Sequence, residues 1–155
     1  MDGSIHGTTG EEIMKDLKSI SLKDAKKMLK AMEEKAEELG IGFSFCILDA
    51  LENTLIFEKM DNTSKSSEYM AKAKAQTSLR LGTSTRNIAA LKKKQGFEIA
   101  SFGGNCKTDV IGGISLYAKK DDQEPAGAIG VSGATQEVDE EVAIAGAKAI
   151  DMMIK

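Results

Sequence analysis

The residues best suited to covalent chemistry in this 155-residue chain are two cysteines and a single histidine. Cys106 lies beside Lys107, and a neighbouring cation favours the nucleophilic thiolate. Cys46 alternates with apolar residues, which is typical of a buried small hydrophobe. His6 lies near the N-terminus, so any Cys–His or Ser–His mechanism would depend on the N-terminal stretch. The sequence therefore predicts no catalytic residue, and its carboxylates lack the clustered spacing of a metal site.

Lys74 and two turns that contain glycine are the candidate anion-binding residues. Lys74 lies next to an apolar helical stripe and would face a cleft as an anion partner, although its spacing favours a surface lysine with a partly buried stem. The paired Gly112 and Gly113 allow a ligand to approach the backbone closely, but they serve an ordinary turn equally well. Ser132 and Gly133 lead into a predicted helix N-terminus, where free N–H groups bind anions.

Small side chains dominate residues 126–135 and the helix that follows them. Ala126, Ala128 and Gly130 share one face of a predicted strand, which allows close approach of either a helix or a flat ligand. Tight packing of a helix on the sheet is the simpler explanation for most of these positions. A ligand niche with a floor of short side chains is the alternative.

Composition points to one globular domain. The chain has 21 Lys and Arg residues against 24 Asp and Glu residues, and 41% of its residues are hydrophobic. This balance suits a packed core and gives no electrostatic footprint for nucleic acid. The acidic N-terminus and the lack of a long apolar run predict neither a secretory signal nor a membrane helix. We therefore expect a cytoplasmic protein with an N-terminal extension over residues 1–20 and a domain over residues 21–155.

Helical and alternating apolar patterns follow one another along the domain. Ser21 and Asp24 form a capping-box pattern, and Gly40 supplies a C-terminal cap. The last helix is apolar around much of its circumference, so we expect it to pack on the sheet and on a neighbouring subunit. The order of elements favours an α+β fold with helices on an antiparallel sheet. The patterns predict helices over 22–39, 65–81 and 136–154, a short helix between Thr85 and Gly96, strands over 43–47, 54–60, 113–118 and 126–131, and a weaker strand over 97–102.

Four ordered segments carry a family resemblance. They are SLKDAKKMLKAMEEKAEELGI (21–41), FCILDALENTLIFEKMDN (45–62), AKAKAQTSLRLGTSTRNI (71–88), and GGISLY with AGAIGVSGATQEVDEEVA (112–117 and 126–143). Together they are similar to the GlcG/HbpS-like family, which also occurs as the C-terminal domain of PduO-type corrinoid adenosyltransferases. The chain departs from the family pattern at Leu51-Glu52, in place of turn glycines, and at Ser115, in place of a proline.

The resemblance implies a three-layer α/β/α sandwich around a five-stranded antiparallel sheet, of profilin-like shape. It also implies a homo-oligomer, often an octamer, and a link to haem or to corrinoids. Five residues match the family's motif positions and are the predicted ligand-binding residues: Lys74, Gly112, Gly113, Ser132 and Gly133.

We expect a non-enzymatic, oligomeric small-ligand-binding protein for haem, a corrinoid or another small acidic metabolite, with no nucleic-acid or membrane partner. One alternative is an enzyme that acts on a small carboxylic or hydroxy acid, with Lys74 as the anchor and Cys106 or Asp49 as the reactive group. Another is an accessory structural oligomer. No segment resembles an ATP-binding adenosyltransferase domain. Because haem iron is usually held by His, Cys, Met or Tyr, its candidate ligands are His6, Cys106, Tyr69 and Met70.

Overall fold

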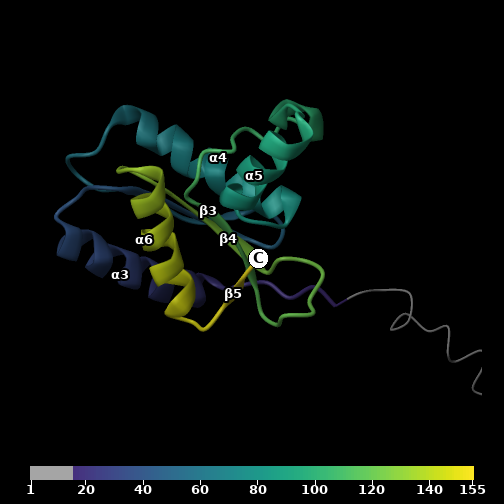
Figure 1. Ribbon diagram of the computed structural model, residues 1–155. Helices are drawn as coiled ribbons and strands as arrows, with labels where there is room; N and C mark the ends of the chain where they lie inside the picture. Colours follow the sequence, from purple (N-terminus) through teal and green to yellow (C-terminus); the bar gives the residue numbers. More distant parts are fainter. Residues whose placement is uncertain (1–15) are drawn as a thin grey trace, which may run out of the picture.

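A five-stranded antiparallel sheet forms the middle layer of the protein (Figure 1). The computed structural model describes residues 16–155. The strands are β1 (Ser44–Asp49), β2 (Thr54–Lys59), β3 (Gly113–Tyr117), β4 (Gly127–Ser132) and β5 (Met153–Ile154), in the spatial order β2-β1-β4-β3-β5. Helices cover both faces of the sheet, so the predicted α+β fold and its three layers are confirmed.

One face of the sheet packs against α3 (Leu22–Leu39) and α6 (Gln136–Lys148). α3 begins at the predicted capping box, where Ser21 N donates to Asp24 Oδ2 at 2.9 Å and Asp24 N donates to Ser21 Oγ at 3.1 Å. Packing of its apolar stripe stabilises the helix, since an isolated helix of this length is marginal in water. The buried stripe consists of Ala25, Met28, Met32 and Ala36.

The other face packs against α4 (Lys65–Leu81), which α5 (Thr85–Gln95) follows along the chain. Gly130 lies so close to α4 that an added Cβ would be 2.7 Å from Ala75 N and would also meet Ala71 O. Ala128 and Cys46 belong to the same buried cluster, and burial raises the pKa of Cys46 to about 12. The small residues of β4 therefore serve helix packing, and Cys46 is the buried hydrophobe that its spacing predicted. The alternative prediction, a ligand niche whose floor is formed by these strand residues, is therefore wrong.

The last helix is shorter than its sequence pattern predicts. α6 ends at Lys148. Asp151, which has φ +53°, lies in the turn that follows, and Met153–Ile154 then pairs with Leu116 and Tyr117 as β5. The apolar residues predicted as the end of a helix are therefore the edge of the sheet, because the chain reverses direction before them.

The packing bears on two further expectations. The segment predicted as a weak strand contains a 3-10 helix, η1 (Ile99–Phe102), closed by hydrogen bonds from Ser101 N to Glu98 O and from Gly103 N to Ala100 O. The second apolar side of α6 packs on α3, where a Cβ on Gly146 would lie 3.0 Å from Met32 Sδ. α3 therefore covers part of that side within the protomer, and packing of α6 on a neighbouring subunit stays a prediction.

The described chain before α3 lies against the domain. Ile20 is buried in the core, and its N–H donates to Ala126 O at 2.9 Å. Lys18 pairs with Asp122 at 3.0 Å. His6, a candidate iron ligand, falls outside the described residues. None of the helices within residues 16–155 has the length and apolar character needed to cross a bilayer.

Gly130→Ala tests the close approach of α4 to β4. The added methyl group would overlap the α4 backbone, so we expect the free energy of unfolding to fall by about 2–4 kcal/mol. Gly104→Ala is the matched control, because a Cβ there meets nothing within 4 Å. Chemical denaturation measures both variants, and an equal loss of stability in the two would contradict the packing.

Candidate functional site

Lys74 is buried inside the protein. Its side chain is 1% exposed, and Nζ donates to Val131 O at 2.8 Å and to Asp139 Oδ2 at 2.9 Å. The surface position that its spacing favoured is therefore wrong. Asp139 is itself 2% exposed, so Lys74 and Asp139 form a buried ion pair between α4 and α6.

Sequence reasoning missed Asp139, because acidic residues are common in the first turns of a helix. The available signal was its place on the buried stripe of α6, one turn before Val142 and two turns before Gly146. Asp139 Oδ1 accepts from Ala134 N at 2.8 Å, which fixes the turn before α6. Burial raises the pKa of Asp139 and lowers the pKa of Lys74, while the attraction between the two groups opposes both shifts.

The paired glycines make room for this ion pair. A Cβ on Gly112 would lie 2.7 Å from Lys74 Nζ, and a Cβ on Gly113 would meet the backbone of Lys74. Gly112 also has φ +133°, a conformation that favours glycine. Ser132 and Gly133 directly follow Val131, whose carbonyl accepts from Lys74. The structure thus brings all five sequence-predicted residues together, and their binding of a ligand stays a prediction.

Cys106 and Asp49 have structural roles. Cys106 is 3% exposed in an apolar cluster with Ile88, and burial raises the pKa of its thiol. The expectation of a favoured thiolate is therefore wrong. Asp49 Oδ1 accepts from Leu51 N and Asn53 N, both at 2.9 Å, which holds the hairpin turn without glycine. Burial of Cys106 and the hydrogen bonds of Asp49 therefore give both side chains a part in holding the fold.

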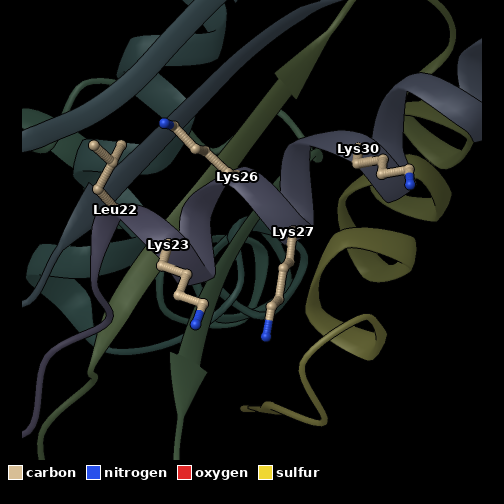
Figure 2. Close-up of a pocket in the computed structure, with 5 residues that line it drawn as sticks. All are labelled: Leu22, Lys23, Lys26, Lys27 and Lys30. Carbon is tan, nitrogen blue, oxygen red and sulfur yellow. The ribbon is translucent and has the colours of Figure 1, made fainter.

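A hollow of about 480 Å³ lies on the exposed side of α3 (Figure 2). In Figure 2, Lys23 and Lys27 extend to one side of the helix and Lys26 to the other, with Lys30 further along. No role was predicted for these lysines from the sequence. The missed signal was their spacing, since residues three or four apart are neighbours on a helix surface. The hollow is lined by Leu22, Lys23, Lys26, Lys27 and Lys30.

The charge of this lysine cluster is not balanced within residues 16–155. None of the ion pairs that these residues form includes one of the four lysines. A second hollow of about 330 Å³, beside α5, also contains lysines, but Glu98 and Asp109 line it too and Lys92 lies 3.9 Å from Asp109. The α3 hollow is therefore better suited to an anion. Within the described chain, no three His, Cys, Asp or Glu side chains gather as a metal site requires.

A carboxyl pair lies between α3 and β2. The pKa of Glu58 is raised to about 7. Burial is the largest cause, and a hydrogen bond with Glu33 and repulsion from the charge of Glu33 raise the pKa further. Glu58 Oε2 is also buried without a hydrogen-bond partner among the described residues. Ionised Glu58 is therefore unfavourable in the folded protein.

Comparisons with known proteins agree with the resemblance read from the sequence. The family model described as haem degrading protein HbpS-like matches residues 20–148. A Citrobacter freundii protein, described as an uncharacterized 15.0 kDa protein in the dhaT-dhaS intergenic region, is 30% identical over 131 residues. The match covers 78% of this chain and 84% of that protein.

Solved structures share the fold. A double mutant of Streptomyces reticuli HbpS is 27% identical, with a TM-score of 0.78, and the match covers 92% of this chain and 94% of that chain. Klebsiella pneumoniae ORFY is 25% identical, with a TM-score of 0.79 and coverage of 88% and 94%. A PduOC complex with haem is 23% identical, with a TM-score of 0.78 and coverage of 87% and 97%, and shows the same fold.

Lys74→Met tests the buried ion pair. The substitution leaves Asp139 buried without its cation, so we expect the free energy of unfolding to fall by about 3–5 kcal/mol. Adding Asp139→Asn removes the second charge while an oxygen remains for Ala134 N, and should recover part of the loss. Urea denaturation of the four proteins in this double-mutant cycle measures the coupling. Strictly additive losses would mean that the two side chains do not interact.

Glu58→Gln tests the raised pKa of Glu58. Because folding favours the protonated carboxyl, its contribution to stability is complete below the ordinary glutamate pKa of 4.5 and is lost as pH rises through the raised pKa of about 7. We expect the variant to exceed wild type by about 1 kcal/mol at about pH 8 and to match it near pH 5. Denaturation at both pH values measures this, with the exposed Glu34→Gln as control. A difference that does not change with pH would rule out the titration.

Proposed function

The chain belongs to the HbpS-like family, and on that premise we propose that it binds a small acidic ligand, a tetrapyrrole of the haem type. The observation that carries the proposal is the hollow on α3, which combines four lysines with an apolar side chain. Haem is a flat apolar ring with two carboxylate arms, so a site for it needs both kinds of surface.

The lining of the hollow supplies both surfaces. Leu22 is 47% exposed at its edge, and the methylene stems of lysines cover apolar groups while their ammonium groups stay in water. Each ammonium carries three N–H donors that suit carboxylate oxygens. The residues present therefore fit the acidic arms and one face of the ring.

Electrostatics in the free protein favour an anion at this place. Lys23 and Lys27 are neighbours at i,i+4, as are Lys26 and Lys30, and like charges at this spacing destabilise a helix by a few tenths of a kcal/mol per pair. Lys23 also lies in the first turn of α3, where the helix dipole is positive and disfavours a cation. A bound dicarboxylate relieves both costs.

The described residues do not provide an iron ligand at the hollow. Cys46 and Cys106 are buried, and Tyr69 and Met70 belong to α4, which covers the opposite face of the sheet from α3. His6 is outside the described residues. The proposal is therefore one of binding through acidic groups, and no step of it passes through the iron.

The buried group around Lys74 has a supporting part in this proposal. The Lys74 ammonium is already satisfied by Asp139 and Val131. We propose that Lys74, Gly112, Gly113, Ser132 and Gly133 hold the turns at the ends of β3 and β4.

We also propose a homo-oligomer, with the octamer of the family pattern as the expected state, and the cytoplasm as its compartment. Exposed apolar side chains support self-association, since Leu51 is 68% exposed and Phe102 is 49% exposed. The free thiols of Cys46 and Cys106 suit a reducing compartment. Light scattering coupled to size-exclusion chromatography gives the mass in solution, and a monomer there would overturn the oligomer.

Titration with haemin, followed by absorbance, tests the proposed function. We expect a saturable spectral change in wild type and affinity about tenfold weaker in Lys26→Glu, Lys27→Glu, because two of the four positive charges of the hollow become negative. Lys93→Glu, Lys94→Glu makes the same change of net charge on α5 and should bind as wild type does. Cobalamin in a parallel titration tests the corrinoid version. No saturable change with either compound would overturn tetrapyrrole binding.

A further inference from the structure

We infer that the α3 hollow recognises the carboxylates of its ligand and not the metal, so that a metal-free porphyrin dicarboxylate binds as tightly as haem. The inference deepens the proposed function and rests on it. The residues that line the hollow differ in what they can bind: the carboxylate arms of the ligand, its apolar ring or its metal.

The lining of the hollow donates hydrogen bonds and does not coordinate metals. A lysine ammonium has N–H donors and no lone pair, and Leu22 has no polar atom in its side chain. The sulfur atoms nearest along the helix belong to Met28 and Met32, and both side chains are fully buried on the side of α3 that faces the sheet. No group of the hollow itself therefore offers the lone pair that coordinates iron.

The spacing of the four lysines suits a ligand with more than one acidic group. Lys23 and Lys27 lie at i,i+4 and extend to the same side of the helix, while Lys26 extends to the other side (Figure 2). Lys30 follows Lys26 at i+4 and Lys27 at i+3, so that all four are neighbours on one helix surface. The i,i+4 pairs Lys23 with Lys27 and Lys26 with Lys30 therefore offer two sets of ammonium groups to a ligand with two acidic arms.

Repulsion among the four lysines in the free protein adds to the free energy that an anionic ligand releases on binding. Four cations without carboxylate partners among residues 16–155 repel one another, because they are spaced three and four residues apart on the helix. Removing two of these charges should therefore leave the free protein at least as stable as wild type. It should also abolish most of the stabilisation that the ligand gives. A lysine cluster with only a solvated role would show the first effect and not the second, so the loss of stabilisation by the ligand is the discriminating result.

The decisive experiment compares haemin, protoporphyrin IX and its dimethyl ester on the full chain, by equilibrium titration with absorbance and fluorescence. For wild type we expect the dissociation constants of haemin and protoporphyrin IX to agree within about threefold, and the dimethyl ester to bind about tenfold more weakly or worse. Raising the salt concentration should weaken both acids alike, because screening acts on the charges that they share.

Lys26→Gln, Lys27→Gln is the test variant, and Lys93→Gln, Lys94→Gln is the matched control on α5. The test variant should weaken both haemin and protoporphyrin IX by about tenfold, while the control stays within about twofold of wild type. Thermal melting of the free proteins checks that the test variant folds and is not destabilised. His6→Ala should leave haemin affinity unchanged.

The outcomes separate this inference from the proposed function. If haemin binds and protoporphyrin IX does not, or if His6→Ala weakens haemin alone, the metal is recognised and the inference is overturned while the proposed function stands. If both acids bind but the α3 variant binds them as wild type does, the hollow is not the site and the inference is overturned. If neither compound binds wild type, the proposed function itself fails.

Discussion

The buried ion pair between Lys74 and Asp139 is the constraint around which the three layers are arranged. Lys74 belongs to α4 on one face of the sheet and Asp139 to α6 on the other, so the pair joins the two outer layers. Charges removed from water are tolerated only when they are paired and hydrogen-bonded. Here Val131 O and Ala134 N complete the set of partners, so the pair fixes the end of β4 and the turn before α6.

The glycines of the sheet follow from that constraint and from the short distance between α4 and β4. At Gly112 the missing side chain leaves the space that the Lys74 ammonium occupies. At Gly130 it lets the α4 backbone come into contact with the strand. Both positions look like ligand-binding glycines in the sequence, because close approach of a helix and close approach of a ligand require the same absence of a Cβ.

Local signals were sufficient to predict most of the fold. The apolar spacing and caps of α3, the hairpin of β1 and β2, and the long helix α4 all depend on neighbours in the sequence. β5 was not predictable in this way, because two residues carry no periodicity and their partners lie on β3. Lys74 was misplaced for a similar reason, since only the packed structure brings Asp139 beside it. The lysines of the α3 hollow were visible in the sequence, but their lack of neighbouring carboxylates is a property of the packed surface.

The arrangement of β4 between β1 and β3 has a consequence for the order of folding. Ser44 pairs with Ser132 and Asp49 with Gly127, so the central contacts of the sheet join segments that are far apart along the chain. Closing such a large loop lowers the entropy of the chain before the stabilising contacts form, and this slows folding. A ribosome must therefore synthesise β4 before the first hairpin finds its partner strand, and until then Phe45 and Ile47 lack the neighbour that buries them.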